Sequence, residues 1–542
     1  MPNTKKLLSI TNLKKYFPVA KSSLFQKEKM YVRANEDISL DIYEGETVGI
    51  VGESGCGKST LGRVLLQLYE QTAGTTMYYG RSIYDVAPKY MKDTLKHAKK
   101  YVSKYLAAQV NADKLCAECD ALGDNADFFL LQKKNLAVAA AKTALMDVTQ
   151  ILGGFVAVPE ALESGAAILL RLYDIDVARA KLKERKTELT LDEEGLIMDK
   201  DELAAAGKST ASAEKKIEAL KTKIAQTEEH IEANRAKRRT IEAELEALKA
   251  IYADNEEFAK CEAMLDDGVD LARLTYNEMR LLRKDLQIIF QDPYSSLDPR
   301  MTIGQIIEEG LVTHNFYKHG SPKMKEHILQ TMRDCGLQDY MLHRYPHQFS
   351  GGQRQRICIA RALAVKPKFV VCDECVSALD VSIQSQIINL LQELQEKEKF
   401  TYLFISHDLS VVRFISTRIA VMYLGNIVEL APSETIFADP RHPYTVALLS
   451  SIPTTDPDDL NKDRIILEGN IPSPIRPPAG CKFHSRCFMA CDKCKRVPPP
   501  LVEIEPGHFV ACHFAEQRKI DADGNYLFEL PKMEKKSSRL DG

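Results

Sequence analysis

The chain has 542 residues and a formal net charge of −3, because 73 lysines and arginines are balanced by 76 aspartates and glutamates. This length leaves room for about three domains, and the near-neutral charge gives no basic field that would favour nucleic acid. The apolar runs are too short to cross a membrane and the first six residues show no signal-peptide core, so we expect a cytosolic protein. Its 13 cysteines are then expected to be buried thiols or metal ligands rather than disulfides.

The first chemical motif follows the short β-branched run Thr47 to Val51, which predicts a buried strand. Residues 52–59 read Gly-Glu-Ser-Gly-Cys-Gly-Lys-Ser and fit the phosphate-loop pattern G-x-x-x-x-G-K-[ST], with a predicted helix over residues 59–68 behind them. Glycine permits close approach of the backbone and a helix N-terminus favours anions, so we expect phosphate binding here. Lys58 would contact the β- and γ-phosphates and Ser59 would bind Mg²⁺. The candidate residues are Gly52, Gly55, Cys56, Gly57, Lys58, Ser59 and Thr60.

Residues 87–273 differ in composition from the sequence on either side, since they are rich in Ala, Lys and Glu and poor in Gly and Pro. They predict an inserted helical domain. Within it, residues 213–252 keep one heptad frame, which is typical of a coiled coil about 60 Å long. The apolar seam positions are Ile217, Leu220, Ile224, Ile231, Ile241, Leu245, Leu248 and Tyr252, with Thr227, Asn234 and Arg238 in the remaining places. The seam would pack against another helix of the insert or a partner chain; an ordinary bundle helix is the alternative.

Two short motifs inside the insert resemble binding sites but are weaker indications than the phosphate loop. Gly207 to Thr210 resembles a second phosphate loop, but the required upstream glycine is Glu202, so we interpret it as a linker that breaks a helix. Cys116 and Cys119 form an isolated pair, and whether they bind metal stays open.

Alternating strands and helices return in residues 367–430, which predicts a parallel sheet covered by helices. The expected strands are Phe369 to Cys372 and Tyr402 to Ile405, with a helix over residues 383–396 between them. Asp373 and Glu374 follow the first of these strands. There, Asp373 can bind Mg²⁺ and Glu374 can polarise an attacking water.

A second anion-binding helix N-terminus is predicted just before this strand, at Ser350, Gly351, Gly352 and Gln353. Two such loops exceed what one nucleotide needs from one chain. Together with the phosphate loop, this segment resembles the ATP-binding cassette (ABC) ATPases, whose Leu-Ser-Gly-Gly-Gln signature is Phe349 to Gln353 here. The resemblance implies an α/β P-loop NTPase fold, with a RecA-like core and a helical signature subdomain. It also implies ATP bound between the phosphate loop of one subunit and the signature of another.

The same resemblance implies further site residues. Gln291 matches the Q-loop residue that senses Mg²⁺ and the γ-phosphate, Asp380 lies in the D-loop, and His407 matches the switch histidine. Catalysis would then depend on Glu374, His407 and Gln291, and Mg²⁺ on Ser59, Gln291 and Asp373. Tyr16 resembles the aromatic residue that stacks on adenine, with Phe17 as the alternative one position further on.

The last hundred residues hold two proline clusters around closely spaced cysteines, which predicts a C-terminal domain over residues 441–542 with little regular structure. Four cysteines suit a [4Fe–4S] cluster or a structural Zn²⁺, and some relatives carry the cluster on them. The expected ligands are Cys481, Cys487, Cys494 and Cys512, and His484, Cys491 and His513 are spare candidates. Spacing alone does not separate the two metals.

The resemblance narrows to ATP-binding subunits of oligopeptide/dipeptide importers, on residues 51–60, 286–301, 345–384 and 471–487. It implies ATP hydrolysis that drives peptide import at the cytoplasmic face of the cell membrane. The implied partners are a related or identical second ATPase, two permease subunits and an extracytoplasmic peptide-binding protein, without nucleic acid. The insert has no counterpart in typical members, and Cys375 replaces their Pro or Ala.

A different function is also compatible with the insert. ABC ATPases of the SMC type carry a coiled coil between phosphate loop and signature, and a translation-associated ABC ATPase is a further candidate. The expected domains are residues 1–86 and 274–440 for the ATPase core, 87–273 for the insert and 441–542 for the tail. Neither the transported peptide nor the identity of the second ATPase can be inferred from the sequence.

Overall fold

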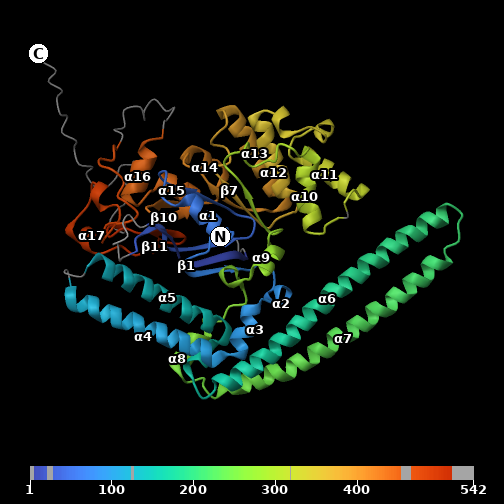
Figure 1. The fold of residues 1–542 in the computed structure, drawn as a ribbon, viewed down its shortest axis with the longest axis horizontal. Helices are drawn as coiled ribbons and strands as arrows, with labels where there is room; N and C mark the ends of the chain where they lie inside the picture. Colours follow the sequence, from blue (N-terminus) through green and yellow to red (C-terminus); the bar gives the residue numbers. More distant parts are fainter. Residues whose placement is uncertain (1–4, 21–28, 124–126, 318, 453–464, 516–542) are drawn as a thin grey trace, which may run out of the picture. The chain divides into compact units, whose positions relative to one another are not determined.

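The computed structural model describes residues 5–20, 29–123, 127–317, 319–452 and 465–515. The chain forms two compact units: unit 1 combines Met1–Thr76 with Arg280–Gly542, and unit 2 is Met77–Met279 (Figure 1). The compact unit 2 is therefore somewhat longer than the insert expected over residues 87–273. Of the expected tail domain, residues 453–464 and 516–542 lie outside the described residues.

Unit 1 is built on an eight-stranded sheet in the order β11-β12-β10-β9-β3-β8-β7-β6. The strands from β9 to β6 are parallel, and β10, β12 and β11 extend the sheet in antiparallel pairs. Every residue of β3, β7 and β8 is buried, as parallel strands covered on both faces require. The bounds are β3 Thr47–Val51, β6 Leu286–Ile289, β7 Phe369–Asp373, β8 Thr401–Ile405, β9 Arg418–Tyr423, β10 Asn426–Pro432, β11 Val502–Glu505 and β12 His508–Val510.

The helices of unit 1 pack on this sheet and on one another. One continuous apolar cluster joins α10 to α14 with β6, β7, β8 and β9. The predicted helices over 59–68 and 383–396 correspond to α1 and α13. The bounds are α1 Lys58–Leu65, α10 Ile303–Thr313, α11 Pro322–Asp334, α12 Gly351–Leu363, α13 Val381–Glu398, α14 Leu409–Ile415 and α15 Ser433–Ala438.

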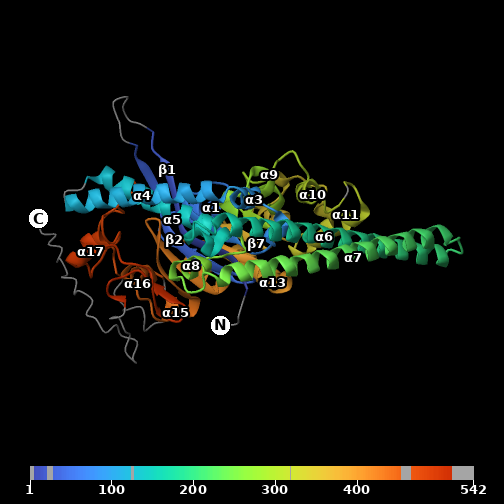
Figure 2. The same ribbon diagram turned by 90° about the horizontal axis from the view of Figure 1, so that it is seen from below.

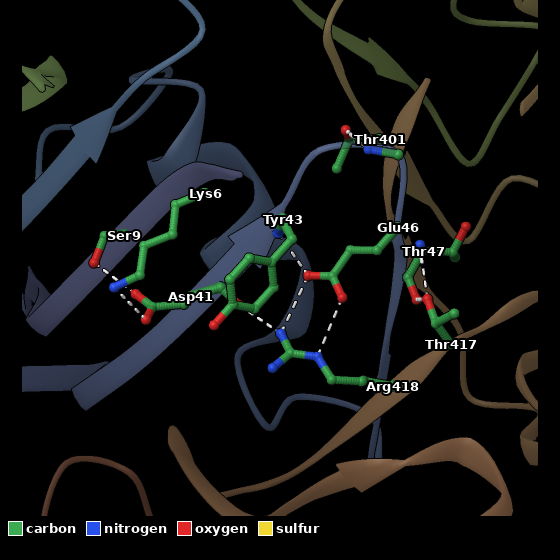
Figure 3. Close-up of polar contacts among 10 residues, drawn as sticks. Lys6, Ser9, Asp41, Tyr43, Glu46, Thr47, Thr401, Thr417 and Arg418 are labelled. Carbon is green, nitrogen blue, oxygen red and sulfur yellow. Dashed lines mark hydrogen bonds and ion pairs between the residues drawn. The ribbon is translucent and has the colours of Figure 1, made fainter. Parts of the chain in front are cut away.

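A second sheet has the order β2-β1-β4-β5, where β1 (Lys6–Pro18) and β2 (Tyr31–Tyr43) are antiparallel. A polar network joins β2 to the parallel sheet (Figure 3). The Arg418 guanidinium on β9 donates to both carboxylate oxygens of Glu46 at 3.2 Å and to the Asp41 carbonyl. The Thr417 hydroxyl donates to the Thr47 carbonyl at 2.8 Å. The network therefore fixes the entry to β3, and with it the loop that follows β3.

Unit 2 consists almost entirely of helices. The strand β4 (Ala73–Tyr78) leads into it, and β5 (Val269–Asp270) pairs antiparallel with the end of β4 on the way out. The helices are α2 Ile83–Val86, α3 Lys89–Lys96, α4 Ala98–Leu122, α5 Phe128–Leu152, α6 Leu162–Ala205, α7 Ala211–Ala250, α8 Glu256–Glu262 and α9 Tyr276–Leu282, the last of which ends beyond the boundary of the unit.

The two longest helices, α6 and α7, lie side by side as an antiparallel pair (Figures 1 and 2). They have 44 and 40 residues, and Gly207 interrupts the helix between them with a positive φ of 67°. Ile217, Ile241 and Leu245 on α7 are buried, and the other positions of the expected seam are at least half-buried. The seam of α7 therefore packs against a helix of the same chain.

The tail is more regular than we expected. It contains α16 (Pro443–Ser450), α17 (Asp492–Arg496) and the hairpin β11-β12, which pairs with β10. The expectation of little regular structure was therefore wrong for residues 502–510. An unpaired edge at β10 would expose a row of backbone donors and acceptors, and the hairpin satisfies them.

Among the residues that the structure describes, one helical segment, residues 128–157, is long and apolar enough to cross a membrane, and half of its most apolar stretch is buried inside the protein. A helix in the core of a soluble protein can be equally long and apolar. The expectation that every apolar stretch is too short was therefore wrong for this segment.

Candidate nucleotide site

The phosphate loop connects the end of β3 to the start of α1, as predicted. Gly57 precedes the helix with a φ of 102°, and a Cβ atom there would lie 2.1 Å from the Ala34 carbonyl oxygen. Gly52 has a φ of 150°, and its Cβ would lie 2.2 Å from the Met422 carbonyl oxygen. Both positions therefore admit only glycine, because a side chain would be strained and would collide with neighbouring backbone.

The lysine of the loop is buried at 5% exposure. The Lys58 ammonium donates to the carbonyl oxygens of Gly52 at 2.8 Å and Glu53 at 3.2 Å, so it lies within the curve of the loop. Cys56, which is part of the loop, has a buried side chain, and this burial raises the pKa of its thiol. Gly55 and Thr60 are less enclosed, and a Cβ at Gly55 would meet no atom.

Two of the expected magnesium ligands are brought together. The Ser59 hydroxyl at the start of α1 donates to the Asp373 carboxylate at the end of β7, over 2.6 Å. Arg63, one turn further along α1, lies 3.4 Å from the other Asp373 oxygen. Mg²⁺ takes oxygen ligands and needs few from the protein, because nucleotide phosphates and water complete its shell. The hydroxyl and carboxylate fit this ion.

Two of the three expected catalytic side chains, those of Gln291 and His407, approach one carboxylate oxygen of the third, Glu374. The Gln291 amide donates to Glu374 Oε2 at 2.9 Å, and His407 Nδ1 lies 3.6 Å from the same oxygen. They follow β6, β7 and β8, whose carboxyl ends meet at one edge of the parallel sheet. Glu374 itself has a left-handed backbone with a φ of 48°, and its N–H donates to the Ile405 carbonyl at 3.0 Å.

The signature segment forms the N-terminus of α12. The Ser350 hydroxyl accepts from the Gln353 N–H at 3.4 Å, while the Gln353 side chain accepts from the Ser350 N–H at 3.1 Å. A Cβ at Gly352 would lie 2.6 Å from Ile383, so α12 packs closely on α13, which Asp380 precedes. Within the part of the chain that the structure describes, no hydrogen bond or ion pair joins residues 350–353 to the phosphate loop.

The expected adenine-stacking residue has no open face. Tyr16 is 5% exposed, its hydroxyl donates to Glu36, and the Arg33 guanidinium lies 5.7 Å from its ring centre. Phe17 is half-buried and packs edge-on against Tyr69 with ring centres 5.4 Å apart.

Sequence reasoning missed how the segment after Gln291 is held. The Tyr294 ring lies 3.9 Å from the Arg354 guanidinium carbon on α12, and Arg361 donates to the Ser296 carbonyl. These contacts tie the Q-loop to the signature helix. No spacing in the sequence reveals them, because they join residues about 60 positions apart.

The tail cysteines do not form a complete metal site. Among the residues that the structure describes, no group of three or more His, Cys, Asp or Glu side chains is arranged to hold a metal ion. Cys491 and Cys494 have sulfur atoms 3.6 Å apart, and the Cys481 N–H donates to the Cys494 carbonyl at 2.8 Å. The spare histidines are engaged elsewhere: His484 contacts the Cys481 carbonyl and His513 the Val497 carbonyl, both at 2.8 Å. Cys116 and Cys119 are not joined in a disulfide. Cys487 Sγ accepts a hydrogen bond from the Met489 N–H at 3.4 Å.

Taken together, a phosphate loop, a hydroxyl and carboxylate for Mg²⁺ and a carboxylate contacted by glutamine and histidine define an ATPase of the P-loop class. Two family models agree with this class. The model described as ABC transporter matches residues 35–151 and 247–377, and the model described as oligopeptide/dipeptide transporter, C-terminal region, matches residues 428–494.

The similarity to curated proteins shows the family to which this chain belongs. A peptide import ATP-binding protein of Brucella ovis is 53% identical over 247 residues, which cover 45% of this chain and 77% of that protein. The Bacillus subtilis oligopeptide transport ATP-binding proteins YkfD and AppF are 51% and 50% identical, over 45% and 46% of this chain and 75% and 76% of their own length. The chain therefore belongs to the ABC transporter ATPases, in the oligopeptide/dipeptide branch. A solved ATP-binding cassette, MJ0796 bound to ADP and Pi, aligns with 79% of this chain and 99% of its own at 16% identity and a TM-score of 0.39. That likeness is too distant for comparison residue by residue.

Proposed function

We propose that this chain is the ATP-hydrolysing subunit of an ABC importer that moves peptides across the cytoplasmic membrane. The observation that carries the proposal is the convergence of Gln291 and His407 on Glu374, next to the Ser59 and Asp373 pair. Over 45% of its length, this chain is 53% identical to a peptide import ATP-binding protein. The tail match to the peptide-transporter C-terminal region gives no support to an SMC-like or translation-associated function.

The roles follow from chemistry and position. Lys58 and the loop N–H groups would hold the phosphates, and Ser59 and Asp373 would hold Mg²⁺, which neutralises charge on the transferred phosphoryl group. Glu374 would orient and polarise the attacking water, with His407 and Gln291 fixing its carboxylate. Signature residues 350–353 and Asp380 would complete the nucleotide site of a second ATPase, related or identical. For adenine we propose Phe17 rather than Tyr16, because the Tyr16 ring is enclosed.

The direct test is transport in the cell of origin. Deleting the gene should abolish uptake of labelled peptides, and a plasmid copy should restore it, whereas the Glu374→Gln copy should not. The same variant, tagged and purified from membranes with ATP, should bring down two permease subunits and the second ATPase, as a subunit at the cytoplasmic face requires. Unimpaired peptide uptake in the deletion strain, or recovery of nucleic acid or ribosomes in place of permeases, would remove the proposal.

For the insert we propose a coiled-coil role of α6 and α7 in assembly or regulation, outside nucleotide chemistry. The support is that every proposed nucleotide residue lies outside residues 87–273, and that the α7 seam is packed against α6. The core boundaries at residues 86 and 274 and the start of the tail domain at residue 441 belong to the same proposal.

For the tail we propose metal binding by Cys481, Cys487, Cys494 and Cys512, with [4Fe–4S] first and Zn²⁺ second. The backbone hydrogen bond between Cys481 and Cys494 supports metal binding, because it holds two of the four cysteines close together. Against metal binding, the described residues do not bring three or more of these side chains to one point. Protein purified without oxygen should contain iron and sulfide, and Cys487→Ser should remove the cluster absorbance. Stoichiometric zinc without sulfide would select the second metal, and metal-free protein would exclude both.

A further inference from the structure

A short piece of the tail reaches the phosphate loop. Residues 482–486, which we call the tail segment, lie between Cys481 and Cys487, and three of their side chains contact other residues of unit 1. The Lys482 ammonium donates to the Leu424 carbonyl at 2.9 Å, and the Phe483 ring is 1% exposed. The Arg486 side chain is 7% exposed although it carries a full charge.

The partner of Arg486 is the second residue of the phosphate loop. Its two terminal nitrogens lie 2.7 and 3.0 Å from the two carboxylate oxygens of Glu53. This paired geometry fixes the direction of the carboxylate as well as its distance. The Tyr423 hydroxyl lies 3.5 Å from one of the same nitrogens, so the guanidinium has a second polar neighbour.

The tail segment also supports the backbone of the loop. The Glu53 N–H donates to the Tyr444 hydroxyl at 2.9 Å. The Phe483 ring packs against Tyr444 and Tyr423 with ring centres 5.3 and 5.2 Å apart. The loop is therefore held at one residue through both its side chain and its N–H, and the tail segment contributes to both.

Glu53 needs such a partner for an electrostatic reason. A carboxylate in a loop that binds a triphosphate repels the ligand, and the repulsion is strong because the site is partly shielded from water. A buried guanidinium neutralises the carboxylate and holds it by hydrogen bonds. We propose that Arg486 is a positioning residue for nucleotide binding, which couples the cysteine-rich tail to the phosphate loop through Glu53.

The test is ATP affinity of the full chain, measured by titration calorimetry, with the KM and kcat of ATP hydrolysis. Arg486→Ala should raise the Kd and KM for ATP about tenfold, in line with loss of a charged hydrogen-bond pair. The kcat should change little, because the contacts of Glu374 are untouched. Arg496→Ala is the matched control, since Arg496 is an exposed arginine of the same tail, and within the described residues no hydrogen bond or ion pair joins it to the loop.

A second variant separates this role from simple support of the tail fold. In the Glu53→Gln/Arg486→Ala pair the repelling charge is gone, so ATP affinity should recover most of the loss seen in Arg486→Ala. Affinity as weak as in Arg486→Ala would show that the arginine serves only the fold of the tail, and an unchanged Kd in Arg486→Ala would overturn the proposal directly. If Arg486→Ala does not fold, Arg486→Lys, which keeps charge but loses the paired geometry, must raise the KM for the proposal to stand.

Discussion

Glu374 lies directly after β7, and its backbone conformation both ends the strand and positions its carboxylate in the candidate site. Its left-handed φ of 48° turns the chain at the end of β7, so that the carboxylate meets Gln291 and His407 instead of continuing the sheet. A non-glycine residue in this region is strained, and such strain is typical of functional positions. The proposed chemistry therefore depends on backbone geometry as well as on the carboxylate.

Lys58→Ala and Glu374→Gln should separate nucleotide binding from hydrolysis. The first removes the ammonium from the phosphate loop and should raise the Kd for ATP. The second keeps the shape of the side chain but removes its basicity, so binding should persist while kcat falls at least a hundredfold. Titration calorimetry and phosphate release measure the two effects, and size-exclusion chromatography with ATP should show a trapped dimer for Glu374→Gln. Hydrolysis at the normal rate in this variant would remove Glu374 from the water-activating role.

Glu36 should make stability depend on pH in acid. Burial by itself would raise its pKa, but the ammonium groups of Lys482 and Lys14 outweigh burial and lower the pKa to about 2. A depressed carboxyl pKa stabilises the folded protein above the unfolded value near 4.5, and the stabilisation is lost as pH falls toward 2. The shift corresponds to about 3 kcal/mol.

Urea unfolding at pH 7, 5 and 3.5 tests this expectation. Glu36→Gln should be less stable than the native chain at pH 7 and should lose less stability between pH 5 and 3.5. Equal acid slopes in the two proteins would show that Glu36 does not titrate as described.

At the scale of elements, the α6–α7 pair contains one nearly buried ion pair. Asp176 on α6 is 3% exposed, and Arg238 on α7 places Nε 3.1 Å from both of its carboxylate oxygens. Arg179 lies 3.2 Å from the same carboxylate. The pair thus links the two helices at one of the polar positions of the seam.

Arg238→Ala should destabilise the helix pair by about 2 kcal/mol, the usual cost of losing a hydrogen bond to a charged group. It should not abolish pairing, because Arg179 still neutralises Asp176. Native-state hydrogen exchange over residues 162–250 measures the change. Arg235→Ala is the control, since Arg235 is exposed and forms its ion pair with Glu232 on its own helix. Equal exchange rates in both variants would contradict the assigned role.

Some strands and loops could be predicted closely from the sequence, whereas others could not be predicted. The phosphate loop and the strands β3, β7 and β8 were predicted nearly to the residue, since local glycine chemistry and fully apolar runs determine them. The choice between Tyr16 and Phe17 could not be made, because β1 has register shifts around Lys15 that break the strict alternation of strand faces. The strands β11 and β12 were missed because β11 is mostly exposed and, among the described strands, pairs only with β12, while β12 forms by pairing with the distant strand β10, a contact that local sequence does not reveal.

At the scale of the whole molecule, the chain leaves the small sheet at the end of β4 and returns to the same place in that sheet at β5. Met77 pairs with Asp270 and Tyr78 with Val269 in antiparallel register. A two-residue Asn-Gly turn is the usual connection between such strands. Replacing residues 79–268 with Asn-Gly should therefore leave ATP affinity intact while peptide uptake or complex assembly changes. Failure of the shortened chain to fold, with urea unfolding and ATP titration as readouts, would make the insert part of the ATPase core.

The position of the insert also affects how the protein is made. Thr47 at the start of β3 bonds to Thr417 beside β9, 370 residues later in the chain, and β3 lies between β8 and β9 in the sheet. Synthesis proceeds at about 5–20 residues per second, so β3 waits roughly 20 to 70 seconds for its neighbours. Unit 2 is a compact unit formed by the continuous stretch Met77–Met279, so we expect it to fold on the ribosome during that interval. The apolar strand β3, which leads into the phosphate loop, then stays unpaired in the nascent chain during that interval, and an unpaired apolar strand is prone to aggregation unless a chaperone covers it.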